Sequence, residues 1–168
     1  NTGAFTAVDG AEADADGAYA LNAEGPGNLA VACARRGVPL IHMSTDCVFD
    51  GAKDSPYTPN DTPNPLGVYG KTKLQGEVAV REGTERSLVV RVSWIFSRFG
   101  GNFVRTMLRV AQTRDAVSVV SDQVGCPTHA PDLARALITI AEQAAKPGFG
   151  SWGVYHVAGA GEDRKSVV

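Results

Sequence analysis

The chain has 168 residues, of which 43% are hydrophobic and 20% are charged, and its formal net charge is −2. This composition is typical of a globular domain, and the low, scattered charge excludes a nucleic-acid-binding stripe or an anionic-membrane partner. The three cysteines lack metal-ligand spacing, and no apolar run approaches the ~20 residues of a membrane helix. We therefore expect a soluble, cytoplasmic protein with reduced thiols.

The first expected element is a helix over residues 13–36, whose apolar side chains give it a buried side. Gly37 is a natural terminator for this helix. Gly25 and Pro26 lie inside it and interrupt its continuity, because proline removes a backbone donor. The short apolar run 38–43 follows and predicts a buried parallel strand.

A proline-rich stretch over residues 46–65 predicts a long loop. Loops of this length inside a compact domain are usually functional. A second helix is expected over 68–82, followed by a second buried strand over 87–92.

The C-terminal half continues the alternation of helices and strands. We expect a helix over 102–113, a strand over 116–120, a helix over 131–145 and a last strand over 154–157. Pro131 suits the first turn of its helix, where no backbone donor is needed. This order predicts an α/β fold, a partial Rossmann-like, doubly wound parallel sheet with helices on both faces.

Tyr69 and Lys73 are the strongest chemical signal in the sequence. They are four residues apart on the helix over 68–82 and therefore share one face. A phenol normally titrates near pH ~10, and an ammonium group nearby lowers that pKa. The pair is thus suited to act as a general acid toward a carbonyl group. The alternative is a chance spacing on a solvated helix.

Polar and aromatic residues also follow the two central strands. Ser44 and Thr45 come after the strand over 38–43, and Trp94 follows the next strand. Ligands of open parallel sheets bind at the carboxyl ends of strands, so a hydroxyl there could orient a substrate carbonyl beside Tyr69. The alternatives are that the hydroxyls cap a turn and that Trp94 packs in the core.

Five motifs in order give the chain a recognisable family resemblance. They are TAVD at 6–9, NAEGP at 22–26, STDCVFDG at 44–51, PNPLGVYGKTK at 63–73 and DQVGCPT at 122–128. Together they resemble the dTDP-4-dehydrorhamnose reductases, which are extended short-chain dehydrogenases. The resemblance covers nearly all of residues 1–162.

The resemblance implies a catalytic trio of Thr45, Tyr69 and Lys73. Thr45 would hold the 4-keto oxygen of the sugar, and Tyr69 would donate a proton to it as hydride arrives. Lys73 would bind the nicotinamide ribose and lower the pKa of Tyr69. Asn22 resembles an asparagine that supports a proton relay in related dehydrogenases, and a buried structural asparagine is the equal alternative.

The resemblance also implies two sets of binding residues. The cofactor would contact a small-residue turn formed by Thr2, Gly3 and Ala4, together with Tyr69 and Lys73. The sugar nucleotide would contact Thr6, Val8, Thr45, Cys47 and Trp94. Cys47 stands where the family usually has a tyrosine, which shortens one pocket contact. The loop over 122–128 resembles a substrate-side segment without an assigned chemical role.

One family feature is not found in this sequence, the Gly-rich turn that binds pyrophosphate between a strand and a helix. We expect that turn upstream of Asn1, so the chain alone should bind dinucleotide poorly and be inactive. Residues 163–168 match what a translated sequencing adapter would encode, and we expect them to be a non-native tail after a domain over 1–162.

The implied activity is reduction of dTDP-4-dehydrorhamnose to dTDP-L-rhamnose with NADPH or NADH, in a cytoplasmic protein that could be a homodimer. The alternatives are another sugar-nucleotide epimerase or dehydratase of this type, and a non-catalytic regulatory subunit with the same fold. His42, His129 and His156 are isolated in the sequence, so no metal site is predicted from them. Magnesium occurs in some relatives, but the sequence places no ligands for it.

Overall fold

The computed structural model describes residues 1–161 and 163–164 and contains two compact units. The first unit comprises Asn1–Arg91 and Ala141–His156. The second comprises Val92–Ile140 and the described residues from Val157 onward. Within the described residues, no helix is both long and apolar enough to cross a membrane.

The first unit opens with a broken run of helix instead of the single helix expected over 13–36. Its parts are α1 (Gly10–Ala13), α2 (Ala15–Tyr19), a π-helical turn (Ala20–Glu24) and α3 (Gly25–Arg36). Asp14 ends α1 and caps α2 by accepting a hydrogen bond from the Gly17 N–H at 3.0 Å. The π turn has a physical reason, because Pro26 cannot donate to the Asn22 carbonyl as an α-helix would require.

A three-stranded sheet in the order β1-β2-β6 forms the centre of the first unit. Its strands are β1 (Leu40–Thr45), β2 (Ser87–Val92) and β6 (Gly153–His156). β2 and β6 are parallel, and their register places Arg91 beside His156. The expected α/β fold with parallel strand pairing is confirmed.

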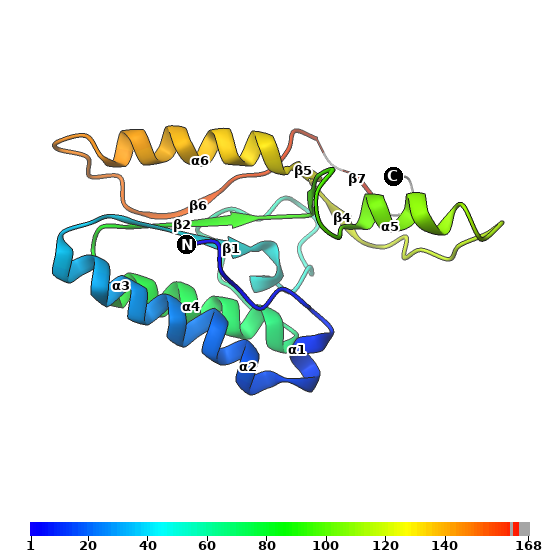
Figure 1. The fold of residues 1–168 in the computed structure, drawn as a ribbon, viewed down its shortest axis with the longest axis horizontal. Helices are drawn as coiled ribbons and strands as arrows, with labels where there is room; N and C mark the ends of the chain where they lie inside the picture. Colours follow the sequence, from blue (N-terminus) through cyan, green and yellow to red (C-terminus); the bar gives the residue numbers. More distant parts are fainter. Residues whose placement is uncertain (162, 165–168) are drawn as a thin grey trace. The chain divides into compact units, whose positions relative to one another are not determined.

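Helices α3 and α4 (Val68–Gly83) run side by side along one face of this sheet (Figure 1). Small residues allow the close approach: a Cβ on Gly27 would lie 3.1 Å from the Ala79 Cβ, and one on Gly83 would lie 2.8 Å from the Ala30 Cβ. The buried core of the unit is apolar, as the hydrophobic effect requires. It comprises Ala30, Leu40, Val80 and Val89, with Cys33 and Val154 packed against it.

The second unit contains short elements. They are β3 (Ile95–Phe96), α5 (Phe103–Val110), β4 (Val124–Gly125), β5 (Thr128–His129), α6 (Ala130–Ala144), which continues into the first unit, and β7 (Asp163–Arg164). β3 pairs with β5 in parallel, and β4 pairs with β7 antiparallel. The strand predicted over 116–120 is wrong. Val117 and Val120 are 42% and 49% exposed, so the apolar run gains no buried neighbour that would fix it as a strand.

Several element boundaries differ from the expectation by a few residues. β1 begins at Leu40, not at 38, because Pro39 has no N–H to donate to the sheet. At its other end the strand extends to Thr45, so Ser44 and Thr45 lie inside it. Pro131 lies in the first turn of α6 as predicted. Of the expected non-native tail, Asp163 and Arg164 form β7 and residues 165–168 lie outside the described residues, so its origin stays a prediction.

Candidate active site

The three side chains expected to carry the chemistry belong to the first unit. Thr45 is the last residue of β1, Tyr69 is the second residue of α4, and Lys73 follows one turn later. The Thr45 hydroxyl is close enough to the Tyr69 phenol to act on its pKa. The fold therefore brings a hydroxyl and a phenol together at the carboxyl end of β1, where open parallel sheets bind ligands.

Lys73 is directed at the backbone of the same strand. Its side chain is 3% exposed, and its Nζ donates a hydrogen bond to the Met43 carbonyl oxygen at 2.7 Å. Burial lowers the pKa of the Lys73 ammonium to about 8, and the carboxylate of Glu77 opposes this shift. The Lys73 ammonium is thus held at the Met43 carbonyl, and Met43 precedes Thr45 by two residues on β1.

The pKa of Tyr69 differs from the sequence-based expectation. Burial is the main reason that the pKa of Tyr69 is raised to about 12; Cys47 and Asp46 act in the same direction, and the neighbouring Thr45 hydroxyl opposes them. The expected lowering by Lys73 is not seen, because burial dominates and the ammonium is bonded to the Met43 carbonyl. In this chain Tyr69 is therefore a protonated phenol at neutral pH.

Thr45 also has the structural role considered as its alternative. Its Oγ1 accepts from the Cys47 N–H at 3.1 Å and caps the 3-10 turn Asp46–Val48. It also donates to Asp46 Oδ1 at 3.0 Å. Burial raises the pKa of the Asp46 carboxyl. One hydroxyl thus shapes the turn and contacts the phenol.

A glycine allows this turn to lie against α4. A Cβ on Gly70 would lie only 2.2 Å from the Cys47 carbonyl oxygen, so no larger residue fits at that position without a shift. At the start of the helix, the Val68 N–H donates to Glu12 Oε1 at 2.7 Å, which satisfies one terminal donor. These contacts fix Tyr69 next to the β1 end.

Asn22 is a buried structural residue in this chain. It is fully buried, its Oδ1 accepts from the Phe5 N–H at 2.9 Å, and its Nδ2 donates to the Phe5 carbonyl at 3.2 Å and to Thr72 Oγ1 at 3.1 Å. These bonds use both amide hydrogens. The side chain thus has the structural role given as the alternative, and a part in a proton relay stays a prediction.

The expected binding residues near the start of the chain lie beside β1. The Met43 N–H donates to the Asn1 carbonyl at 3.1 Å, so the opening segment runs next to the end of this strand. Four of the expected residues are exposed and Ala4 is half-buried. The exposed four are Thr2, Gly3, Thr6 and Val8.

Trp94 belongs to the second unit and has an unusual backbone. Its φ of 43° is in the left-handed region, which is rare for a bulky side chain. A Cβ on Gly125 would lie 2.6 Å from the Trp94 ring, so the indole packs closely against the loop over 122–128. Ser93 Oγ donates to the Cys126 carbonyl of that loop at 2.7 Å. Contact between Trp94 and a sugar stays a prediction.

The histidines and cysteines of the chain are candidates for metal ligands or disulfide partners. Among the described residues, no three His, Cys, Asp or Glu side chains cluster to hold a metal ion, and magnesium stays a prediction. His42 is a fully buried core histidine whose pKa is lowered to about 3, first by burial. Cys33, Cys47 and Cys126 carry thiols and form no disulfide.

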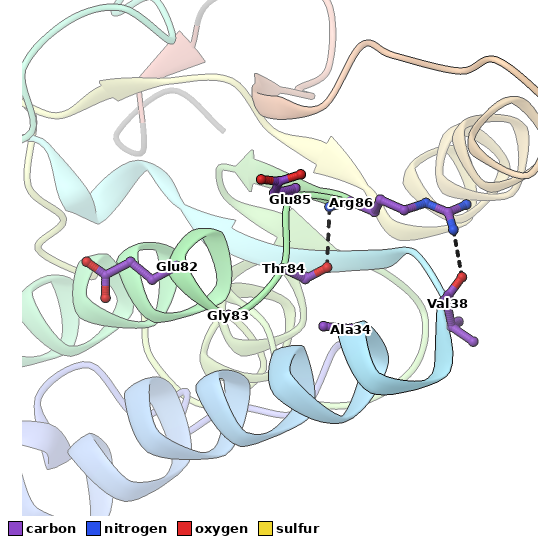
Figure 2. Close-up of a pocket in the computed structure, with 8 residues that line it drawn as sticks. Ala34, Val38, Glu82, Gly83, Thr84, Glu85 and Arg86 are labelled. Atoms are coloured by element: carbon purple, nitrogen blue, oxygen red, sulfur yellow. Dashed lines mark hydrogen bonds between the residues drawn. The ribbon is translucent and has the colours of Figure 1, made fainter.

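Figure 2 shows a pocket of about 340 Å³ at the other ends of the central strands. It includes Val38, which precedes β1, and Arg86, which precedes β2. Arg86 Nη1 donates to the Gly37 carbonyl at 2.7 Å. This pocket is therefore distinct from the carboxyl-end site at Thr45.

A buried ion pair behind the site was missed from the sequence. Glu77 and Arg91 are 2% and 5% exposed, and their Oε2 and Nη2 atoms are 2.7 Å apart. Ser44 Oγ donates to Glu77 Oε1. One signal could have found the carboxylate: Glu77 follows Lys73 by four residues and shares its helix face.

Comparison with known families gives one match over almost the whole chain. Residues 1–166 match the family described as "RmlD substrate binding domain". The chain is 48% identical over 160 residues to a dTDP-4-dehydrorhamnose reductase of Sinorhizobium fredii, covering 95% of this chain and 54% of that protein. It is 45% identical over 163 residues to one of Mycolicibacterium smegmatis, covering 96% of this chain and 48% of that protein.

Solved structures agree with this match. A dTDP-4-dehydrorhamnose reductase of Bacillus anthracis in complex with NADP is 38% identical, with a TM-score of 0.88 over 96% of this chain and 56% of that chain. The Clostridium acetobutylicum ortholog is 40% identical, with a TM-score of 0.90 over 96% of this chain and 55% of that chain. The chain spans about half the length of the relatives it matches.

Proposed function

The chain belongs to the RmlD substrate binding domain family, and we propose that the complete protein reduces dTDP-4-dehydrorhamnose to dTDP-L-rhamnose with NADPH or NADH. One observation carries the proposal: the Thr45 hydroxyl, the Tyr69 phenol and the Lys73 ammonium lie together at the carboxyl end of β1. The named relatives support the choice of substrate.

The residues of this chain suit the nicotinamide end of such a cofactor. The Lys73 side chain is a hydrogen-bond donor beside the end of β1. Thr2 and Gly3 are exposed and follow Asn1, whose carbonyl accepts a hydrogen bond from Met43 of the same strand. When bound, the nicotinamide supplies the hydride. The pyrophosphate-binding turn expected for the family is not in this sequence, so we assign the phosphate contacts to no residue here.

The proposed mechanism uses the protonated Tyr69. Thr45 and Tyr69 hold the 4-keto oxygen, and the phenol gives its proton to that oxygen as the carbonyl carbon is reduced. With a pKa of about 12, the phenol is neutral and carries its proton at neutral pH, as a proton donor must. Lys73, which is held by the Met43 carbonyl, would bind the nicotinamide ribose beside this pair. Solvent then restores the proton.

The sugar-nucleotide pocket is proposed to include Thr6, Val8 and Cys47 of the first unit, and contact of Trp94 with the sugar stays a separate prediction. Cys47 is exposed and sits beside Tyr69. Because a thiol replaces the tyrosine usual in the family, a different sugar nucleotide is the second candidate substrate. We also propose a cytoplasmic location and leave a homodimer and a magnesium requirement as predictions.

The direct test is an assay of protein expressed from the complete reading frame that encodes this chain. We expect loss of NADPH or NADH absorbance with dTDP-4-dehydrorhamnose, and dTDP-rhamnose as product by mass spectrometry. A panel of other 4-keto sugar nucleotides is the control. Faster turnover of another sugar would support the second candidate, and binding without turnover of any sugar would support a regulatory subunit.

A further inference from the structure

Glu77 is a buried carboxylate that binds side chains from two strands of the central sheet. Its Oε1 accepts from Arg91 Nε at 2.9 Å, its Oε2 accepts from Arg91 Nη2 at 2.7 Å, and Ser44 Oγ donates to the same Oε1. All three residues are at most 5% exposed. Charges this deeply buried persist only when they are paired and hydrogen-bonded.

The partners of Glu77 lie next to the candidate active site. Ser44 is the residue before Thr45 at the end of β1, and Lys73 lies one turn before Glu77 on α4. Lys73 Nζ bonds to the Met43 carbonyl, and Glu77 bonds to the Ser44 hydroxyl. Two successive turns of α4 are thus fastened to two successive residues of β1.

Arg91 holds Glu77 from the neighbouring strand. Its guanidinium lies over the Phe49 ring, with 5.0 Å from Cζ to the ring centroid, which restricts where the group can move. Nη1 of Arg91 has no hydrogen-bond partner among the described residues, so Glu77 is the carboxylate that compensates its charge there. The orientation of Glu77 is therefore set from β2.

Glu77 also acts on Lys73 through its charge. Its carboxylate raises the pKa of the Lys73 ammonium, against the larger lowering by burial. Another titratable group near Lys73 is His42 on β1, which burial keeps neutral. Arg91 faces this region from β2 through its pair with Glu77.

We propose that Glu77 is a positioning residue, which is held by Arg91 and sets Thr45 and Lys73 in place against Tyr69. This rests on the proposed reductase function. Misplacement of reacting groups by about 1 Å can cost about a hundredfold in rate, so a fastening of this kind has a measurable effect on turnover.

The first test is Glu77→Gln in protein from the complete reading frame, which removes the negative charge and keeps the shape of the side chain. We expect kcat to fall about ten- to a hundredfold with little change in KM, because substrate contacts stay intact. We also expect the alkaline limb of the kcat profile to move to lower pH, since the loss of a carboxylate lowers the pKa of Lys73. Glu82→Gln, at an exposed site of the same helix, is the matched control and should behave as wild type.

The second test avoids the risk that Glu77→Gln does not fold with Arg91 unpaired. Ser44→Ala removes the hydroxyl and leaves the ion pair, and we expect several-fold lower kcat with an unchanged pH profile. Ser87→Ala is its control, because Ser87 is a buried serine that donates to the Thr84 carbonyl at the other end of β2. If Ser44→Ala and a folded Glu77→Gln both turn over like wild type, the proposal is wrong.

A measurement without substrate separates this proposal from the proposed function. Lysine side-chain NMR follows the titration of Lys73, identified by its loss in Lys73→Met. We expect that titration at lower pH in Glu77→Gln than in wild type. Unchanged titration overturns the coupling even if the enzyme reduces its substrate. A shifted titration with no turnover of any sugar by wild type would contradict the reductase function and leave the coupling intact.

Discussion

At the scale of single residues, burial decides the chemistry of the candidate active site. Tyr69 and Lys73 are both withdrawn from water, and each is shifted toward its neutral form, with pKa values of about 12 and about 8. The proton donor is thereby kept protonated, while the ammonium stays charged at neutral pH. On a solvated helix the same two side chains would titrate close together, near pH ~10.

Tyr69→Phe removes the proposed proton donor and keeps the ring. We expect kcat in protein from the complete reading frame to fall about a hundred- to ten-thousandfold, because a positioned general acid contributes on that order. The melting temperature should stay close to that of wild type. If Tyr69→Phe unfolds the protein and the folded remainder keeps its activity, Tyr69 is a packing residue.

His42 should make the protein sensitive to acid. Its pKa falls from 6.5 to about 3 on folding, so the unfolded state binds the proton first. Stability from this group is complete above pH 6.5 and is lost as pH falls toward 3, by at most about 1.4 kcal/mol per pH unit. Denaturant unfolding at a series of pH values should show a shallower loss for His42→Asn. Equal slopes for both proteins would contradict this role.

At the scale of elements, α4 is positioned by glycines that face other backbones. A Cβ on Gly76 would lie 2.0 Å from the Asn22 carbonyl oxygen. This carbonyl belongs to the π-helical turn, and Pro26 has no N–H to donate to it. The sequence predicted α4 and its bounds well, because a continuous 3.6-residue pattern is a local property. It did not predict which of its glycines approach another chain segment.

Gly76→Ala tests this close approach. Alanine normally stabilises a helix interior relative to glycine, but here the methyl group forces α4 away from Asn22, and we expect a net loss of about 1–3 kcal/mol in unfolding free energy. Gly101→Ala is the control, since a Cβ there meets open space. Chemical denaturation of both variants measures the difference, and a stabilised Gly76→Ala would show that the contact is soft.

At the scale of the whole molecule, this chain matches about half the length of its relatives. We expect the complete reading frame to add a Gly-rich turn whose backbone N–H groups hold the pyrophosphate. Cofactor binding should then be a property of the complete protein.

Titration with NADPH tests this expectation by nucleotide fluorescence. Residues 1–161 alone should bind at least about a hundredfold more weakly than protein from the complete reading frame, because phosphate contacts carry much of the binding free energy. Circular dichroism of the shorter chain is the control for folding. Equal affinities would show that the phosphates bind to residues described here.

The sequence by itself determined the features that depend on local pattern and spacing. The strand over 87–92, the helix from Val68 and the shared face of Tyr69 and Lys73 follow from periodicity, and the five motifs indicate the family. Only the tertiary structure decided the rest, because pairing and burial join residues far apart in the chain. It removed the strand over 116–120, brought Glu77 to Arg91, and raised the pKa of Tyr69 where an isolated pair with Lys73 would have lowered it.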